Sequence, residues 1–393
     1  MLNSNLNRIV TVAEKPERLI IGLMSGTSLD GLDIALCYFK GSGFNIQFEL
    51  LQFETIPYTN AFKQDVKQIF AQQQVSLEKL CLLNASIGSL HAQMILQALQ
   101  KWNVKPGDVD LIASHGQTIY HAPQRLHQKK GYPNATLQIG DGDHIAVKTG
   151  IITISDFRQK HVAAGGEGAP LALYGDVLLG SNPQENRILL NIGGIANLTW
   201  LPANQQHIIC TDVGPGNTLI DAACLKYFNQ PYDDDGQFAF SGQVHPALLK
   251  QLLQHPFFTE HAPKTTGPEL FNSQYVIDAQ QKCNALTMLP EDLIATLSAF
   301  TAEGIIGFIK TYIKGNINKL LISGGGAKNK FIVDYLKRTF PDVVVADTSE
   351  IGIDADAKEA ILFALLANEA IAGEPIIIGS NPAVLMGKFS FPV

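Results

Sequence analysis

The segment from Ile21 to Asp33 combines small residues and carboxylates in a pattern suited to binding a nucleotide. Its sequence, IGLMSGTSLDGLD, reads as an apolar strand that runs into a Gly-Thr-Ser turn, after which a second strand opens. Backbone N–H groups and the hydroxyls of Thr27 and Ser28 could close around a phosphate. Asp30 and Asp33 could hold Mg²⁺ or its waters, because a hard cation prefers oxygen ligands. A tight β-hairpin with polar turn residues is the alternative interpretation.

Glycine-rich stretches recur at four further places, each after a strand-like run or before a helical pattern. They read AGGEGAP (164–170), IGGIANL (192–198), DVGPGN (212–217) and SGGGAKN (323–329). Loops of this kind that met at one cleft would make a nucleotide site. The glycines at 324–326 could let the backbone approach an adenine or ribose, or form a plain tight turn. No stretch matches the G-x-x-x-x-G-K-[ST] or the G-x-G-x-x-G motif.

Asp212 is the candidate general base. It follows a predicted strand at 207–211 and precedes a predicted helix, whose first N–H groups favour an anion. A carboxylate that faces a phosphate there could accept a proton from an attacking oxygen, which typically contributes a factor of ~10²–10⁴ to a rate. An N-cap or turn aspartate is the alternative.

Other polar residues suit a sugar or acid substrate. His115 and Gln117 follow a predicted strand at 109–113 and supply hydrogen-bond donors, although a lone histidine is more often a satisfied core group. Arg158, in the sequence Asp-Phe-Arg, could bind a carboxylate or phosphate through two hydrogen bonds. A surface ion pair between Asp156 and Arg158 is the alternative. Glu359 lies in the first turn of the last predicted helix, where its negative charge could equally be stabilised by the helix dipole.

Composition narrows the class of protein. The length of 393 residues suggests two domains, and 46% apolar with 17% charged residues is typical of a globular chain. A net charge of −7 and one short basic run, RLHQKK at 125–130, argue against nucleic-acid and anionic-membrane partners. The charged first twenty residues and the absence of a run of ~20 apolar residues predict a cytoplasmic protein. The five cysteines predict reduced, buried thiols and no metal site: Cys37, Cys81, Cys210, Cys224 and Cys283.

The order of predicted elements repeats along the chain. In the first half, strands are expected at 19–24, 32–39, 48–56, 109–113 and 151–155, and helices at 61–72, 76–102 and 145–148. In the second half, strands are expected within 187–201 and at 207–211, 319–323 and 343–346, and helices at 217–228, 291–314, 330–339 and 358–372. Two copies of a three-strand meander followed by alternating helices and strands predict an α/β protein with two similar lobes around a cleft. The turn residues at 180–185 divide it into 1–182 and 183–393, and the last helix could return to the first lobe.

Together these motifs closely resemble the anhydro-N-acetylmuramic acid kinases of bacteria. The resemblance rests on the stretches above together with SHGQTIYH, QIGD, DFR, LLNIGGIANLT, TDVGPGNTLIDA and PKTTG, in the family's order from about residue 19 to 391. It implies the actin, hexokinase and Hsp70-like ATPase fold, with ribonuclease H-like lobes and a nucleotide cleft between them. It further implies conversion of 1,6-anhydro-N-acetylmuramic acid, ATP and water into N-acetylmuramic acid 6-phosphate and ADP. A homodimer is also expected.

The resemblance assigns roles to particular residues. It makes Asp212 the base that activates water at the anomeric carbon and Glu359 a second catalytic residue, near the sugar. His115, Gln117 and Arg158 are the substrate-binding candidates. Nucleotide binding, with Mg²⁺, falls to Gly26, Thr27, Ser28, Leu29, Asp30, Gly31, Leu32, Asp33, Gly193, Gly194, Gly214, Gly216, Asn217, Gly324, Gly325 and Gly326.

Two positions depart from the family pattern. Relatives usually have an acid and an amide where this chain has His161 and Glu167, which suggests that the two side chains form a local pair. Two other functions stay open. One is an ordinary sugar or acetate-type kinase of the same superfamily, and the other is a nucleotide-switched binding protein of the Hsp70 kind.

Overall fold

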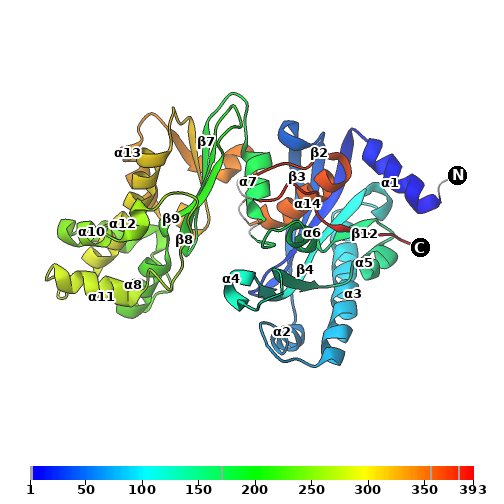
Figure 1. The fold of residues 1–393 in the computed structure, drawn as a ribbon, viewed down its shortest axis with the longest axis horizontal. Coiled ribbons are helices and arrows are strands. Elements are labelled where there is room, and N and C mark those ends of the chain that lie inside the picture. The colour runs from blue at the N-terminus through cyan, green and yellow to red at the C-terminus, as the bar shows by residue number, and fades with distance from the viewer. Residues whose placement is uncertain (1–2, 170, 355, 379–380) are drawn as a thin grey trace. The chain divides into compact units, whose positions relative to one another are not determined.

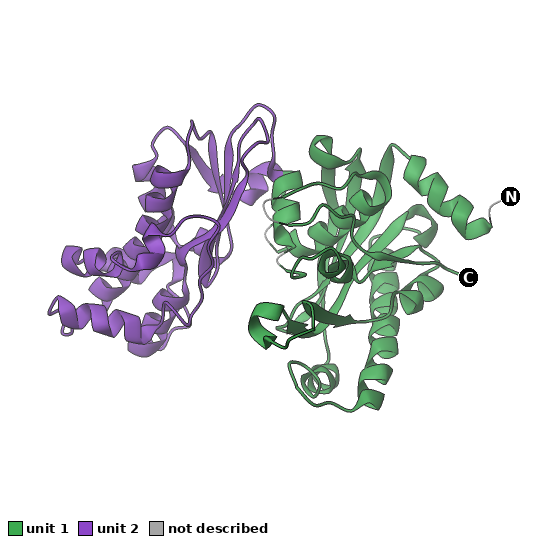
Figure 2. Cartoon of the chain, in the orientation of Figure 1, with its two compact units in different colours: residues 1–179, 352–393 green, residues 180–351 purple. Residues whose placement is uncertain are grey.

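The chain forms two compact units. The computed structural model describes residues 3–169, 171–354, 356–378 and 381–393, so Pro170, at the end of one glycine-rich stretch, lies outside the described residues. Unit 1 comprises residues 1–179 and 352–393, and unit 2 comprises residues 180–351 (Figure 2). Helix α14 (Lys358–Ala372), near the end of the chain, belongs to unit 1.

Unit 1 is built on one mixed sheet. Its strands lie in the order β12-β6-β4-β1-β2-β3, and β5 pairs with β4. Strands β1, β2 and β3 form an antiparallel meander, whereas β4 runs parallel to β1 and β6 runs parallel to β4. The strands are β1 (Glu17–Ser25), β2 (Gly31–Lys40), β3 (Gln47–Pro57), β4 (Leu111–Ala122), β5 (Ala135–Ile139), β6 (Thr153–Ser155) and β12 (Lys388–Ser390).

The alternation of side chains along β1 explains how helices cover the sheet. Ile21 and Leu23 belong to a core cluster that also includes Ile95 and Leu99 of α3. Gly22 points to the other face, where a Cβ would lie 1.9 Å from the carbonyl oxygen of Ala360 in α14. Helix α14 therefore rests directly on the sheet backbone.

Helix α1 (Ser4–Glu14) precedes β1 in the chain, and the other helices of unit 1 lie between its strands in sequence (Figure 1). They are α2 (Asn60–Lys67), α3 (Leu77–Lys101), α4 (Gln124–His127), α5 (Gly142–Thr149), α6 (Phe157–Ala163), α7 (Ala172–Gly180) and α14.

Unit 2 repeats the strand order of unit 1. Its sheet runs β11-β10-β7-β8-β9, in which β7, β8 and β9 form an antiparallel meander and β10 and β11 run parallel to β7. Relabelled by order of appearance, the five strands follow the pattern 3-2-1-4-5 that β3-β2-β1-β4-β6 follows in unit 1. The strands are β7 (Arg187–Ile192), β8 (Ile195–Leu201), β9 (Ile209–Pro215), β10 (Lys319–Ser323) and β11 (Val344–Asp347). This repeat confirms the prediction of two similar ribonuclease H-like lobes.

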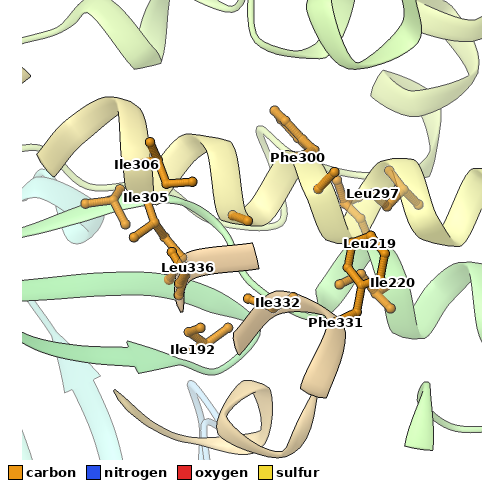
Figure 3. Close-up of a cluster of buried hydrophobic side chains, with 14 of the residues drawn as sticks. Ile192, Leu219, Ile220, Leu297, Phe300, Ile305, Ile306, Phe331, Ile332 and Leu336 are labelled. Atoms are coloured by element: carbon orange, nitrogen blue, oxygen red, sulfur yellow. The ribbon is translucent and has the colours of Figure 1, made fainter. Parts of the chain in front are cut away.

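Helix α12 (Pro290–Tyr312) is the core helix of unit 2. Leu297, Phe300 and Ile305 pack with Ile192 of β7 and Ile332 of α13 (Figure 3). It is the one helix among the described residues that is long and apolar enough to cross a membrane, but 83% of that apolar window is buried inside the unit. The other helices of unit 2 are α8 (Thr218–Phe228), α9 (Gln237–Ser241), α10 (Pro246–Leu252), α11 (Ser273–Lys282) and α13 (Lys330–Thr339).

Two strands run further than the sequence predicted. Strand β4 continues through His115 and Gln117, and β9 continues through Asp212. Each polar residue has a strand neighbour, since Gln117 pairs with Ile139 and Asp212 pairs with Asn197 in register. A polar side chain does not end a strand when adjacent strands satisfy its backbone. The prediction of buried cysteines holds for Cys37 and Cys224, whereas Cys210 and Cys283 are only partly buried and Cys81 is exposed on α3.

Candidate functional site

The turn between β1 and β2 is held from beneath by its backbone and by one buried leucine. The Leu29 N–H donates to the Gly26 carbonyl at 3.3 Å, and the Tyr58 N–H donates to the Asp30 carbonyl at 3.1 Å. Leu29 has a left-handed φ of 60° and is only 3% exposed, which inserts its side chain into a core cluster. Thr27 and Ser28, in contrast, are exposed. The turn thus presents two hydroxyls and backbone groups on a fixed frame.

A chain of buried side-chain hydrogen bonds runs under this turn. The Tyr58 hydroxyl donates to Ser25 Oγ at 2.8 Å, and Ser25 Oγ donates to Gln117 Oε1 at 2.6 Å. The Gln117 amide then donates to the Gly26 carbonyl at 3.3 Å, and His91 Nε2 lies 2.9 Å from the Tyr58 hydroxyl. Gln117 is fully buried and its side chain supports the turn, while its contact with a substrate stays a prediction. Nothing in the sequence indicated the roles of Ser25 in β1, Tyr58 after β3 and His91 in α3.

Packing explains some of the candidate glycines and leaves others unexplained. At Gly31, a Cβ would lie 2.5 Å from the Ile56 carbonyl oxygen, and at Gly216 it would lie 2.2 Å from the Gly193 carbonyl oxygen. At Gly26, the nearest described atom to a Cβ is Ser28 Oγ, at 3.6 Å. Gly193 is similarly open. The protein's own packing does not require glycine at these two positions, which fits a need for close approach by a ligand.

Five charged groups of unit 1 influence one another electrostatically: Asp30, Asp33, Arg158, Asp356 and Glu359. Desolvation raises the pKa of Asp33, which accepts a hydrogen bond from Thr55 Oγ1 at 2.6 Å, and the charges of Asp356 and Asp30 raise it further. Desolvation also raises the pKa of Glu359, while Arg158 lowers it and Asp33 raises it. Crowded carboxylates of this kind favour a nearby cation. Among the described residues, no group of three or more His, Cys, Asp or Glu side chains forms a complete metal site.

Arg158 contacts His115 and a glycine loop. Its Nε donates to His115 Nε2 at 3.0 Å, and its Nη1 donates to the Gly168 carbonyl at 2.7 Å. The alternative pair with Asp156 is wrong, because the Asp156 carboxylate contacts Lys388. Burial, together with the charge of Arg158, lowers the pKa of His115 to about 3. His115 is therefore a neutral acceptor that positions Arg158, and it cannot act as a general acid near neutral pH.

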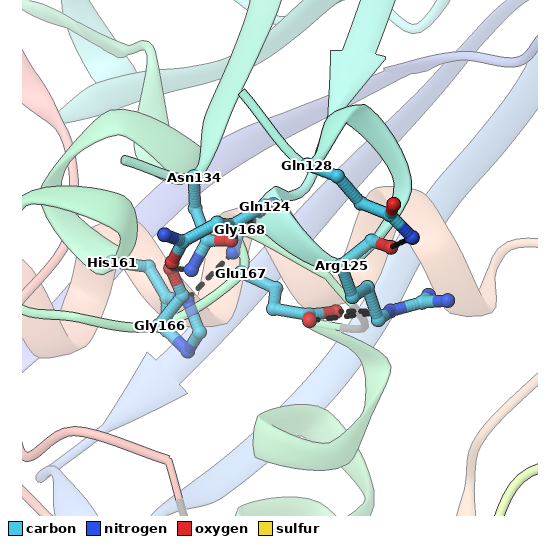
Figure 4. Close-up of polar contacts among 8 residues, drawn as sticks. All are labelled: Gln124, Arg125, Gln128, Asn134, His161, Gly166, Glu167 and Gly168. Carbon is cyan, nitrogen blue, oxygen red and sulfur yellow. Dashed lines mark hydrogen bonds and ion pairs between the residues drawn. The ribbon is translucent and has the colours of Figure 1, made fainter. Parts of the chain in front are cut away.

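His161 and Glu167 do not form the expected pair (Figure 4). Glu167 accepts from Arg125 Nε at 3.1 Å and 3.2 Å. The ring of His161 is buried, and its Nδ1 accepts from the Gly168 N–H at 2.9 Å. Since Nδ1 accepts, the ring proton lies on Nε2, which donates to Asn381 Oδ1 at 3.1 Å. The two side chains thus hold the same loop through different partners.

In unit 2, three of the predicted glycine-rich stretches meet at one edge of the sheet. The Gly216 N–H donates to the Gly194 carbonyl at 2.9 Å, and the Asn217 N–H donates to the Gly193 carbonyl at 2.8 Å. A Cβ on Gly325 would lie 3.4 Å from Asn217 Nδ2. Gly324 and Gly326 have packing reasons of their own, since a Cβ on either would meet Ile192. Gly214 has a φ of 148° and faces Phe258, so it is also explained by the fold.

Asp212 lies within β9 and is not the N-cap of the following helix. That position is taken by Asn217, so the N-cap alternative is wrong. The Asp212 carboxylate accepts a hydrogen bond at Oδ2 from the Thr266 N–H at 2.9 Å. Burial raises the pKa of Asp212, and the Thr266 N–H lowers it. A partly buried carboxylate with one fixed donor is suited to accept a proton from a water molecule.

Comparison with known proteins gives one family. The model of the family described as anhydro-N-acetylmuramic acid kinase matches residues 18–387. The chain is 50% identical to the protein of that name from Pseudoalteromonas atlantica, over 400 residues that cover 100% of both chains. It is 48% identical to the one from Pseudoalteromonas translucida, covering 99% of this chain and 100% of that one. The one from Caldanaerobacter subterraneus is 41% identical, with 98% and 100% covered.

Proposed function

The chain belongs to the anhydro-N-acetylmuramic acid kinase family, and we propose that it carries out the reaction for which that family is named. In this reaction ATP and water convert 1,6-anhydro-N-acetylmuramic acid into N-acetylmuramic acid 6-phosphate and ADP, a step in recycling peptidoglycan. The identity of 41–50% over essentially whole chains supports the assignment. The structural observation that carries the proposal is the environment of Asp212. Its carboxylate is partly buried, accepts a hydrogen bond from the Thr266 N–H, and lies on the strand that leads to Gly214 and Gly216.

We assign the central proton transfer to Asp212. Its carboxylate takes a proton from a water molecule whose oxygen bonds to the anomeric carbon, and the bond from that carbon to O6 breaks. The electron pair stays on O6, which forms a bond to the γ-phosphorus of ATP while ADP leaves. Burial raises the pKa of Asp212, which makes its carboxylate a stronger base than that of an exposed aspartate.

The remaining candidate residues divide between the two substrates. Gly26 to Asp33 would receive the ATP phosphates, because Gly26 is open and the hydroxyls of Thr27 and Ser28 are exposed. The edge formed by Gly193, Gly194, Asn217 and Gly324 to Gly326 would receive the adenosine part. Arg158 and Glu359 would bind the sugar: the guanidinium suits the sugar's lactyl carboxylate, and the carboxylate suits its hydroxyls.

Asp30 and Asp33 are the residues that would hold Mg²⁺. Desolvation raises the pKa of Asp33, and the charges of Asp356 and Asp30 raise it further, so a cation is favoured beside these carboxylates. One or two carboxylates suffice, because Mg²⁺ usually keeps several waters and shares the phosphates of the nucleotide. When bound, Mg²⁺ would offset the negative charge of the phosphates.

A cytoplasmic homodimer is part of the proposal. None of the five cysteines, all of which the structure describes, forms a disulfide, which is consistent with a compartment that keeps thiols reduced. Light scattering coupled to size-exclusion chromatography measures the subunit number directly, and a single-chain mass would remove the dimer from the proposal.

The function is tested by ADP release with three sugars. We expect turnover with 1,6-anhydro-N-acetylmuramic acid and little or none with N-acetylmuramic acid or N-acetylglucosamine. In ¹⁸O-water, the product should carry one solvent oxygen at C1. Phosphorylation of a free hydroxyl without ¹⁸O would show an ordinary sugar kinase. Slow ATP hydrolysis that no amino sugar changes would show a nucleotide-switched binding protein.

A further inference from the structure

The segment from Pro263 to Gly267 lies along the free edge of strand β9. Strand β9 is the last in the sheet order of unit 2, so one side of its backbone has no strand partner. The segment fills that role, because the Asp212 N–H donates to the Lys264 carbonyl at 3.1 Å. We refer to residues 263–267 as the edge segment. It also supplies the Thr266 N–H that bonds to the Asp212 carboxylate.

Thr211 fixes the edge segment to the strand. Its hydroxyl accepts from the Lys264 N–H at 2.9 Å and donates to the Lys264 carbonyl at 3.1 Å. Thr211 is 5% exposed, so water does not compete freely for these bonds. Thr211 and Asp212 are adjacent, and successive side chains of a strand point to opposite faces. The strand therefore holds the edge segment through both residues at once.

Lys264 anchors the same segment to the interior of unit 2. Its side chain is buried, and Nζ donates to the Phe257 carbonyl at 2.5 Å. Nζ also lies 4.3 Å from the centre of the Phe257 ring and 5.8 Å from that of Phe308. Burial of an ammonium group is costly unless the group is hydrogen-bonded, and the Phe257 carbonyl accepts such a bond from Lys264. Glu260 is the charged group that acts on this ammonium.

We propose that Thr211 and Lys264 are positioning residues for Asp212, which act by holding the edge segment so that the Thr266 N–H stays on the carboxylate. This inference rests on the proposed role of Asp212 as the base. The Thr266 N–H stabilises the ionised carboxylate, so loosening the edge segment raises the pKa of Asp212. A base must be ionised to act, and the acidic limb of the kcat profile then moves to higher pH.

The test compares Thr211→Val with Thr211→Ser. Valine keeps the shape of threonine without the hydroxyl, whereas serine keeps the hydroxyl. We expect Thr211→Val to lower kcat about tenfold and to move the acidic limb upward by roughly 0.5–1 pH unit. The KM values for ATP and sugar should stay within about twofold of the wild type, and Thr211→Ser should behave like the wild type.

A measurement without catalysis supports the kinetic one. The amide signal of Thr266, followed by NMR in protein with ¹⁵N-labelled threonine, should titrate with Asp212 and report a higher pKa in Thr211→Val. If that variant does not fold, Lys264→Met tests the same point, because it keeps an apolar stem against Phe257 and removes the ammonium.

The outcomes separate the two proposals. A pH profile of kcat like that of the wild type, together with an unchanged Thr266 titration, would overturn the positioning role. The variant measured is Thr211→Val, or Lys264→Met if Thr211→Val does not fold. Retention of full activity by Asp212→Asn would instead overturn the role of Asp212 as the base, whatever the variants at Thr211 and Lys264 do.

Discussion

Arg158 donates a hydrogen bond from Nε to Nε2 of His115, and the 3.0 Å contact determines both the charge and the tautomer of the histidine. Because Nε2 accepts, the ring is neutral and its proton lies on Nδ1. With Nη1 bonded to Gly168, Nη2 of Arg158 makes no hydrogen bond to a described residue. The guanidinium is thus held by two of its nitrogens and offers the third to a ligand.

Arg158→Lys should weaken sugar binding more than ATP binding. Lysine carries the charge but cannot contact His115, Gly168 and a carboxylate in the geometry of a planar guanidinium. We expect the KM for the anhydro-sugar to rise at least about tenfold, with the KM for ATP within about twofold. Steady-state kinetics with each substrate varied in turn measures both values. Equal increases in the two KM values would contradict a sugar-specific role.

Gly26→Val should weaken nucleotide binding strongly without unfolding the protein. The position has open space and no left-handed φ, so the fold accepts a side chain that would occupy the room left for phosphate. We expect ATP affinity by calorimetry to fall at least about tenfold. Gly31→Ala is the control for stability. Its Cβ would meet the Ile56 carbonyl oxygen, so this variant, unlike Gly26→Val, should lose about 1–3 kcal/mol of unfolding free energy. Wild-type ATP affinity in Gly26→Val would remove the turn from the nucleotide site.

The sequence predicted elements well where apolar periodicity and turn residues agree. The bounds of β10, α13 and α14 coincide with the predicted ranges 319–323, 330–339 and 358–372. The predicted strands ended too early, before His115 and Asp212. The prediction followed runs of apolar residues and could not see which strands lie beside one another in the sheet. The hydrogen bonds that continue a strand come from neighbours elsewhere in the chain, such as β5 for β4.

Side-chain partners were the least predictable part of the site. His161 and Glu167 lie close in sequence and were expected to pair, but Glu167 pairs with Arg125, which is 42 residues away. The support of the Gly26 turn by Tyr58 and His91 depends on how β1, α3 and β4 pack. No local sequence pattern predicts that these side chains, which are distant in sequence, come into contact. The glycine-rich stretches at 192–198, 212–217 and 323–329 were easier, because the sequence places them at strand ends, where the loops that bind ligands in α/β sheets lie.

His161→Asp and Glu167→Gln should have independent effects. The ion pair between Arg125 and Glu167 is exposed and contributes about 0–1 kcal/mol. His161→Asp removes the acceptor for the Gly168 N–H and buries a charge, so it should be clearly destabilising. We expect the changes in unfolding free energy caused by the two single substitutions to add, within about 0.5 kcal/mol, in the double variant. A larger deviation, measured by chemical denaturation, would indicate direct coupling.

Acid should destabilise the protein through buried, neutral histidines. Burial lowers the pKa of His91 to about 4, below the ~6.5 of an unfolded chain. The unfolded state therefore binds a proton first as the pH falls, so the stability contribution is complete above about pH 6.5 and decreases below it. Between pH 7.5 and 5.5 we expect His91 to account for a loss of about 1 kcal/mol. In His91→Gln, the difference in unfolding free energy between these two pH values should be smaller by that amount, and an unchanged difference would exclude His91 as the source.

Asp212→Asn separates catalysis from binding. Asparagine has nearly the same shape as aspartate, and its carbonyl oxygen can still accept the Thr266 N–H, so the edge of β9 should keep its structure. It cannot take a proton from water. We therefore expect affinities for ATP and sugar within a few-fold of the wild type and a kcat lower by roughly 10²–10⁴. Calorimetry measures the first and ADP release the second, with Asp221→Asn as a control, because Asp221 is an acidic residue of α8 whose pKa is also raised, to about 6. If purified Asp212→Asn turned over the anhydro-sugar at a near-normal rate, the proton would have another acceptor and Asp212 would have a structural role only.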